Sequence, residues 1–454
     1  MATTSNFSSL EDFTSKKSTL AGASADDTIS FSGVSGTLSF TDTDGEGFES
    51  AAIFSGMDAV VDSTTGFEKL ALASGANTVQ ISNTAQSIGI TSVVGGSAND
   101  SIDASQYTAS ITISGGSGAD TISGGIDGDV LNGDAGNDSL VGGAGDDTFL
   151  GGADSDTLNG GAGDDSMVGG AGSDYYLLAD EADVVVESLS EGTDSVLANV
   201  EDYTLASNFE VLILDGTVVE GTGNALANTI VGNAENNSID GGAGNDSMVG
   251  GAGNDYYIVD SLSDVVVDSA GTDTIKSNVM QYTLAANVEI LELGTGNIAY
   301  GNASANTLLG SSGDNFLYGA AGSDSLSGGS GNDLMQGALS SSTGGRGEID
   351  TLTGGVGADI FVLGYSSGAL YNDGVAGSAG TSDFALITDF AAGTDSLKLY
   401  GSAAKYSLAN VTVGSVTGAG LYYETGATDE LIAIIQVSGA AATTSNTITT
   451  AIFV

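Results

Sequence analysis

The sequence predicts an all-β protein, a parallel β-solenoid that ends in a C-terminal β cap. Three observations predict this class. A nine-residue repeat recurs along the chain, and its sixth position is usually aspartate. The eighth position of each repeat in the longest block is large and mostly apolar. Glycine accounts for 71 of the 454 residues, whereas proline is absent. A short fixed period is typical of stacked repeats in which every unit is one turn and one strand.

The longest block holds seven nonapeptides without a gap, from Gly115 to Leu177. Glycine accepts positive φ, so the glycine-rich half of each repeat can turn tightly. The three residues after position six are expected to be extended, and the middle one points inward because side chains alternate along a strand. Two repeats then close one coil, and turns on one side stack at every second repeat. The position-six residues of this block are Asp120, Asp129, Asp138, Asp147, Asp156, Asp165 and Asp174.

These aspartates predict calcium sites. Stacked strands lie about 4.8 Å apart, so each gap between stacked turns gains backbone carbonyls and position-six carboxylates. Such oxygens are the ligands that Ca²⁺ takes in proteins. The alternative is a turn-forming aspartate whose side chain caps its own backbone, but the neighbours in register favour calcium. Because the core is thin and a glycine-rich backbone loses much entropy on folding, we expect calcium to supply much of the folding free energy.

Two later blocks, at 223–258 and 301–362, change their position-six residue along the block. Each begins with asparagine, which keeps the turn geometry and loses the charge, so we expect weak or no calcium binding at these turns. The asparagines are Asn228, Asn237, Asn306 and Asn315. The further candidate calcium ligands are Asp246, Asp255, Asp324 and Asp333, with Asp359 and Asp100 in copies that have fewer stacking partners. Asp389 and Asp395 are expected to be turn residues.

A longer repeat lies over the short one, with an offset of roughly 80 residues. Its inserts carry short runs of valine, isoleucine and leucine between turn residues, which predict further strands. A helix is conceivable at 203–214, but the alternation at Val211–Leu214 favours a strand. The expected segments are a degenerate β-solenoid at 1–114, repeat blocks at 115–177, 223–258 and 301–362, inserts at 178–222 and 259–300, and a C-terminal cap and secretion-signal region at 363–454.

The composition excludes several function classes. There are 59 acidic residues against 7 lysines plus arginines, a formal net charge of −52, and no histidine, cysteine or tryptophan. Such a field repels nucleic acids and anionic membranes. The missing side chains exclude thiolate and imidazole metal sites and leave no nucleophile–base relay. We therefore expect no enzyme activity and a hard, oxygen-seeking ion. Adaptation to high salt is the alternative source of the charge, but its acids would scatter rather than follow a nine-residue period.

The first residues give no targeting signal. Residues 1–22 lack the apolar core of a signal peptide. No run in the chain approaches the roughly 18 apolar residues of a membrane-spanning helix. We expect a soluble chain with no membrane span that, if exported, does not use an N-terminal signal of the general secretory type.

The tandem glycine–aspartate nonapeptides resemble those of RTX (repeats-in-toxin) proteins, a family whose repeats form a β-roll that folds on Ca²⁺ outside the cell. The motif GGVGADIFVL at 354–363, followed by ITDFAAGTDSLKL at 387–399, resembles the closing module of type I-secreted members. The nearly uncharged tail is similar to their C-terminal export signal. Residues 1–94 match only loosely.

The resemblance implies several Ca²⁺ ions, type I secretion and a place outside the cell or on its surface. The chain most resembles surface-layer, adhesin or fibril members that consist mostly of repeats. We expect a calcium-binding structural protein that folds on Ca²⁺ and self-assembles into a surface layer, sheath or fibril. The alternative is a monomeric calcium-dependent adhesin or matrix component that binds glycans such as a cell-surface polysaccharide. Tyrosine pairs at 175–176 and 256–257 would suit a sugar contact, but we expect them to fill wider coils.

Overall fold

The computed structural model divides the chain into two compact units, Met1–Thr229 and Ile230–Val454. The described residues are 4–7, 28–31, 38–40, 50–53, 58–62, 69–72, 75–82, 90–338, 347–365, 368–371, 381–424, 429–437 and 451–453. Within them the regular structure is β-strand apart from a 3-10 turn at Ala403–Lys405, which confirms the predicted all-β class. No helix among these residues is long and apolar enough to cross a membrane.

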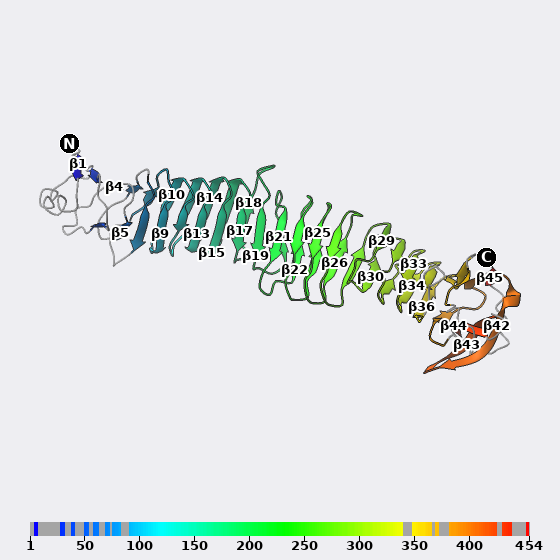
Figure 1. The fold of residues 1–454 in the computed structure, drawn as a ribbon. Helices are drawn as coiled ribbons and strands as arrows, with labels where there is room; N and C mark the ends of the chain where they lie inside the picture. Colours follow the sequence, from blue (N-terminus) through cyan, green and yellow to red (C-terminus); the bar gives the residue numbers. More distant parts are fainter. Residues whose placement is uncertain are drawn as a thin grey trace. The chain divides into compact units, whose positions relative to one another are not determined.

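In the first unit, strands alternate between two parallel sheets, so that each strand pairs with the strands two places before and after it (Figure 1). One sheet contains β1 (Thr4–Phe7), β2 (Thr28–Phe31), β4 (Ser50–Ile53), β6 (Lys69–Leu72), β8 (Ser92–Val94), β10 (Thr112–Ser117), β12 (Val130–Ala135), β14 (Thr148–Ala153), β16 (Ser166–Ala171) and β18 (Val184–Val186). The other contains β3 (Leu38–Phe40), β5 (Asp58–Asp62), β7 (Thr78–Ser82), β9 (Ser101–Gln106), β11 (Thr121–Ser123), β13 (Ser139–Ala144), β15 (Thr157–Ala162), β17 (Tyr175–Leu178), β19 (Ser195–Ala198) and β21 (Val211–Leu214). β20 (Tyr203–Thr204) pairs with β22 (Glu220–Thr222), and β23 (Thr229–Val231) begins at the last residue of this unit.

The register shows that two nonapeptides form one coil. Ile113 of β10 lies opposite Leu131 of β12, and Ile122 of β11 lies opposite Leu140 of β13. The partners in each pair are 18 residues apart, twice the sequence repeat. The predicted stacking of turns at every second repeat is therefore confirmed.

The core of this block is a column of inward side chains between the two sheets. In β14, Phe149 is buried while its neighbours Thr148 and Leu150 are exposed, as the alternation of a strand requires. The position-eight side chains of all seven nonapeptides are fully buried: Ile122, Leu131, Leu140, Phe149, Leu158, Met167 and Tyr176. The predicted inward position is confirmed, and the narrow column leaves a thin core.

The turns need glycine where neighbouring coils touch. Gly136 and Gly145 have φ values of 125° and 102°. A Cβ on either residue would lie closer than 3.0 Å to backbone atoms of the adjacent coil. Asp154 occupies the position equivalent to Gly145 in its own repeat with φ 77°, because aspartate tolerates the left-handed region better than most residues. The turns therefore stack backbone on backbone.

The second unit uses the same parallel arrangement. One series contains β24 (Ser238–Asp240), β26 (Tyr256–Val259), β28 (Thr274–Ser277), β30 (Ile290–Leu293), β32 (Thr307–Leu309), β34 (Ser325–Ser330), β36 (Ile349–Val356) and β40 (Phe384–Phe390). The other contains β29 (Gln281–Thr283), β31 (Ile298–Tyr300), β33 (Phe316–Ala320), β35 (Leu334–Ala338), β37 (Ile360–Val362), β41 (Ser396–Leu399) and β45 (Ala451–Phe453). β25 (Ser247–Val249) pairs with β27 (Val265–Val267), and β38 (Gly364–Tyr365) pairs antiparallel with β39 (Gly368–Ala369).

The inserts continue the solenoid with shorter coils. In the first unit, Val196 of β19 lies opposite Leu212 of β21, and in the second unit Ile275 of β28 lies opposite Leu291 of β30. Both steps are 16 residues. Val211–Leu214 is a strand, so the favoured interpretation of that segment is confirmed.

The C-terminal part of the second unit is the predicted β cap. β44 (Asp429–Val437) joins β40 in parallel, and then β43 (Val416–Glu424) and β42 (Tyr406–Val413) pair antiparallel. Phe384, Leu431 and Ile434 form its buried core. The change to antiparallel pairing replaces the stacked coils by a hairpin.

Candidate metal sites

The position-six aspartates form ladders that join successive turns. Asp120 donates its backbone N–H to Oδ1 of Asp138 at 2.7 Å, and Asp138 donates to Oδ1 of Asp156 at 2.8 Å. On the other side of the coil, Asp147 donates in the same way to Oδ1 of Asp165 at 2.8 Å. One oxygen of each accepting carboxylate therefore holds the turn stack in register.

The second oxygen of most of these carboxylates is buried and has no hydrogen-bond partner among the described residues. A buried carboxylate oxygen without a partner is costly and calls for an explanation, such as an ion. In the first unit these oxygens belong to Asp120, Asp138, Asp147, Asp156, Asp165 and Asp174, and in the second to Asp255, Asp324, Asp333 and Asp359. Hard oxygen donors repeated along stacked turns fit Ca²⁺.

A glycine makes room for each of these oxygens. A Cβ on Gly115, Gly142 or Gly160 would lie closer than 3.0 Å to Oδ2 of the aspartate five residues later in the same repeat. The Cβ on Gly142 would also meet the carbonyl oxygen of Gly160 at 2.6 Å. The first glycine of the repeat is thus needed for space around the carboxylate, a role that the φ argument from the sequence did not find.

Burial opposes ionisation of these carboxyl groups when no cation is bound. It is the largest cause that raises the pKa of Asp138, Asp147 and Asp156 to about 7, and carboxylates of adjacent turns raise it further. Hydrogen bonds from backbone N–H groups act in the opposite direction. The pKa of Asp324 is raised to about 8, again mainly by burial. A divalent cation beside such groups would favour their charged form.

Two predicted ligands differ from the others because both of their oxygens accept hydrogen bonds. Asp129 accepts from the N–H groups of Ile111 and Gly125. Asp100 accepts from the N–H of Asn77 and of Gly96, each at 2.8 Å. These two carboxylates are less in need of a cation than their neighbours. Asp246 is buried like the others and donates its N–H to Oδ1 of Asp264 at 3.0 Å.

The asparagine turns are satisfied without a cation. Asn228 accepts from the N–H of Asn224 at 2.7 Å, and its amide donates to the carbonyl of Phe209 at 2.9 Å. Asn306 accepts from the N–H of Asn302 at 2.8 Å and donates to the carbonyl of Val288 at 3.3 Å. The neutral amide therefore closes its own turn and bonds the preceding coil. This geometry supports the prediction of weak or no calcium binding at these turns.

The ladders contain acidic residues that the nine-residue period did not find. Asp165 donates to Oδ1 of Asp183, and Asp194 donates to a carboxylate oxygen of Glu210. In the second unit the added members are Asp264, Asp273, Glu289, Asp350 and Asp395. Asp395 also accepts from the N–H of Ala391, so the turn role predicted for it is present as well. Asp389 accepts from the N–H groups of Gly354 and Gly355.

A β-solenoid with buried carboxylates repeated along its turns has the architecture of a calcium-binding β-roll. The family model of the RTX calcium-binding nonapeptide repeat (4 copies) matches residues 112–140, 141–176, 222–257, 300–335 and 345–364. Together with the β-solenoid, these matches identify an RTX β-roll protein, whose repeats bind several Ca²⁺ ions. The region that they cover is a structural, non-catalytic fold. They contain every predicted ligand except Asp100. A comparison with curated proteins found no match.

Proposed function

We propose that the chain is an extracellular structural protein that folds when Ca²⁺ binds between its stacked turns. The observation that carries this proposal is the series of buried carboxylate oxygens on successive coils, such as Asp138, Asp156 and Asp174. A formal charge of −52 resists compaction of the chain. Ca²⁺ gives these oxygens a partner, and its binding free energy then becomes folding free energy.

The ligands in this proposal are the position-six aspartates. One oxygen of each carboxylate stays in the ladder, the other serves the ion, and backbone carbonyls of the glycine turns supply further oxygens. Asp100 and Asp129 are the weakest members because both of their oxygens accept hydrogen bonds. The full set is Asp100, Asp120, Asp129, Asp138, Asp147, Asp156, Asp165, Asp174, Asp246, Asp255, Asp324, Asp333 and Asp359.

Self-assembly into a surface layer, sheath or fibril is the second part of the proposal. Among the described strands, β42 pairs on one side only, with β43, and an unpaired strand edge can join another chain. β18 and β27 are the last strands in the order of their sheets and carry exposed valines. These are Val184 and Val186 on β18 and Val265 and Val267 on β27. Apolar edges of this kind favour association.

Export before folding is the third part. RTX repeat proteins are typically secreted by type I systems and act outside the cell. In a cytosol poor in calcium, repulsion among the carboxylates keeps the chain unfolded, and external calcium folds it after export. The export signal is assigned to the C-terminal region at 363–454. A chain that lacks residues 400–454 should stay in the cell, and its normal export would contradict this part.

A monomeric calcium-dependent adhesin that binds glycans is the second candidate. Tyr300 of β31 and Tyr318 of β33 stack with ring centroids 4.9 Å apart on the outward side of neighbouring strands. Such aromatic faces offer apolar area beside a polar hydroxyl. Tyr176 and Tyr257 are fully buried, so they are core fillers rather than sugar contacts.

Electron microscopy and sedimentation after calcium addition to chelator-treated protein separate the two candidates. Sheets or filaments that appear with calcium and dissolve in chelator support the assembling protein. A folded species that sediments as a monomer at every protein concentration contradicts assembly. Retention of that monomer on a glycan array, lost in the Tyr300→Ala variant, would favour the adhesin.

A further inference from the structure

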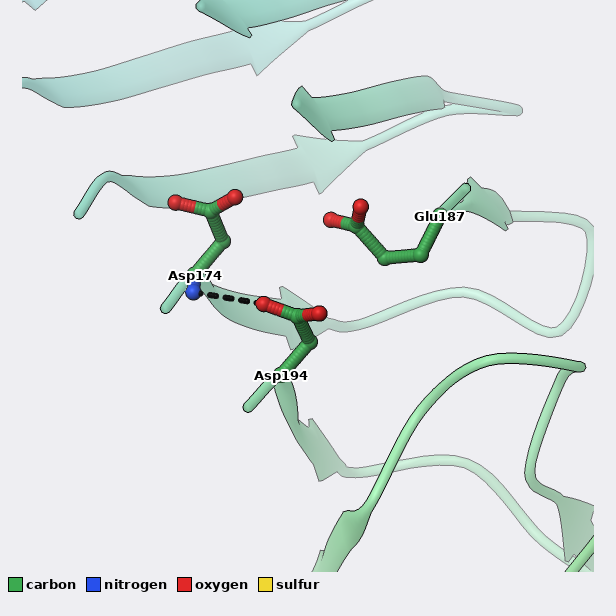
Figure 2. Close-up of side chains that lie close together, drawn as sticks. All are labelled: Asp174, Glu187 and Asp194. Carbon is green, nitrogen blue, oxygen red and sulfur yellow. Dashed lines mark hydrogen bonds between the residues drawn. The ribbon is translucent and has the colours of Figure 1, made fainter. Parts of the chain in front are cut away.

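Three carboxylates that the nonapeptide repeat does not explain converge where the first repeat block meets its insert. Asp174 precedes β17, Glu187 follows β18 and Asp194 precedes β19. One oxygen from each lies within 4.8 Å of the others, and all three side chains are buried. Figure 2 shows the three carboxylates directed toward a common region, with the N–H of Asp174 bonded to Asp194 at 2.8 Å. Glu187 and Asp194 lie outside the matched repeats.

Unpartnered oxygens point into this cluster. Oδ2 of Asp174 and Oε2 of Glu187 are buried and lack a hydrogen-bond partner within the described part of the chain. The side chains of Asp174 and Glu187 are 1% and 5% exposed. The hydroxyl of Tyr176 donates to the other oxygen of Glu187. A Cβ on Gly169 would collide with both acidic side chains and with this hydroxyl, so the glycine leaves room for the cluster.

The second unit contains the same cluster, built from Asp255, Asp268 and Asp273. Oδ2 of Asp255 and Oδ2 of Asp273 are buried without a hydrogen-bond partner among the described residues. The hydroxyl of Tyr257 donates to Asp268, as that of Tyr176 does to Glu187. Gly250 leaves the room here, because a Cβ on it would collide with the tyrosine hydroxyl and with Asp255.

The two copies reach this geometry from different local sequences. Glu187 corresponds to Asp268, an acid one methylene shorter. Asp194 follows Asp174 by 20 residues, whereas Asp273 follows Asp255 by 18, so the connecting turn is two residues shorter in the second copy. Neither the acid type nor the turn length is shared, and yet three carboxylates meet beside a tyrosine hydroxyl in both units. A ligand that needs three carboxylates accounts for what the copies keep.

We propose that each cluster, Asp174–Glu187–Asp194 and Asp255–Asp268–Asp273, is a three-carboxylate Ca²⁺ site that binds more tightly than the nonapeptide turns. Calcium affinity rises with the number of charged ligands and with the rigidity of the site. A nonapeptide turn offers two stacked carboxylates, whereas a cluster offers three from one repeat and its insert. The clusters therefore fill first and clamp each insert to the block before it. This proposal rests on the calcium-dependent folding proposed above.

Terbium luminescence excited through tyrosine tests the proposal on the full-length protein. The chain has no tryptophan, so tyrosine is the donor, and the hydroxyls of Tyr176 and Tyr257 contact the clusters. In the wild type, the first Tb³⁺ ions bound should give tyrosine-sensitised emission, and Ca²⁺ should displace them. The variant Glu187→Gln/Asp268→Asn should lose this early emission. Its tightest Ca²⁺ affinity in equilibrium dialysis should weaken by at least about tenfold, the cost of disturbing even an outer-shell partner of a metal ligand.

Matched variants make the result specific. Glu201→Gln/Glu235→Gln removes the same two charges from exposed positions and should behave as the wild type. Asp147→Asn, in a nonapeptide turn, should weaken the later calcium-binding phase and keep the early emission. Tyr176→Phe/Tyr257→Phe should dim the emission while the ion count stays, which serves as an independent test if the acidic double variant does not fold.

The outcomes separate this proposal from the proposed function. Full early emission and unchanged tight binding in Glu187→Gln/Asp268→Asn overturn the cluster sites and leave calcium-driven folding intact. Emission that survives Tyr176→Phe/Tyr257→Phe at full strength also overturns them. A wild-type chain that binds no Ca²⁺ overturns both. Loss of the tight ions in the acidic double variant alone supports the cluster sites.

Discussion

The backbone N–H of Asp138 donates to Oδ1 of Asp156 at 2.8 Å, and Oδ2 of Asp156 stays buried with no hydrogen-bond partner in the described chain. The two oxygens of one carboxylate thus have different tasks. Oδ1 sets the register between coils through a bond that needs no metal. Oδ2 carries the unfavourable charge, so the strength of the stack depends on the cation that meets it.

Replacement of Asp138 and Asp156 by asparagine should convert two calcium turns into neutral turns like that of Asn306. We expect Asp138→Asn/Asp156→Asn to bind fewer Ca²⁺ ions and to keep more β structure in chelator, because a neutral amide bonds a carbonyl where the carboxylate repels its neighbours. Equilibrium dialysis and circular dichroism measure the two effects. Asp127→Asn/Asp164→Asn removes the same charge from exposed side chains and should leave both unchanged. An undiminished ion count in the first variant would count against these ligands.

The reverse change should add calcium dependence. Asn306 lies one coil before Asp324 and donates its N–H to Oδ1 of that residue at 2.8 Å. In Asn306→Asp, a carboxylate replaces an amide beside another buried carboxylate, so the second unit should need more calcium to fold. The calcium midpoint of folding should rise, and the number of bound ions should increase. A midpoint equal to that of the wild type would show that the neutral amide is not what spares this turn from calcium.

The metal-free chain should fold better in acid. The pKa values of Asp138, Asp147 and Asp156 are raised to about 7 in the folded chain, from an ordinary value of 3.8, mainly by burial. A raised pKa means that the folded chain holds protons more tightly than the unfolded chain, so this contribution is complete below 3.8 and is lost as the pH rises through about 7. In chelator, β content should increase from about pH 8 to about pH 5.

Calcium and protons should compete for the same oxygens. The apparent calcium affinity is therefore expected to fall over the same pH interval, which calcium titrations at several pH values measure. Metal-free β content that does not depend on pH would contradict the raised pKa values.

Gly142 should be irreplaceable, although it is one glycine among many. A Cβ there would collide with Oδ2 of Asp147 and with the carbonyl of Gly160. Gly142→Ala should lower the stability of the calcium-loaded protein by at least about 2 kcal/mol and weaken calcium binding. Gly313 has nothing within 4 Å of a Cβ, so Gly313→Ala is the matched control and should cost little. Denaturant unfolding of both variants in calcium decides, and equal losses would refute a steric role for Gly142.

The sequence predicts those parts of the molecule that follow its nine-residue period. Leu140 and Asp147 could be assigned to core and turn because their positions in the repeat determine which way their side chains point. Asp194 and Glu210 could not, because the ladder steps of 20 and 16 residues through the insert are not multiples of nine. The signal that could have found them is the recurrence of acids after the tyrosine pairs in both copies of the longer repeat.

Two further features depend on contacts that no local pattern encodes. The side chain of Asn228 bonds Phe209, on the preceding coil, which only the folded stack brings close. The antiparallel pairing of β42 and β43 in the cap likewise follows from packing against Phe384 and Leu431 rather than from a repeat.

Circular dichroism during a calcium titration of chelator-treated protein tests the central claim most directly. The chain is predicted to be largely unfolded in chelator near neutral pH and to gain β structure cooperatively as Ca²⁺ is added, because the buried carboxylates then acquire their partner. Stable β structure in chelator at neutral pH, unchanged by added calcium, would contradict the claim that Ca²⁺ between stacked turns drives folding.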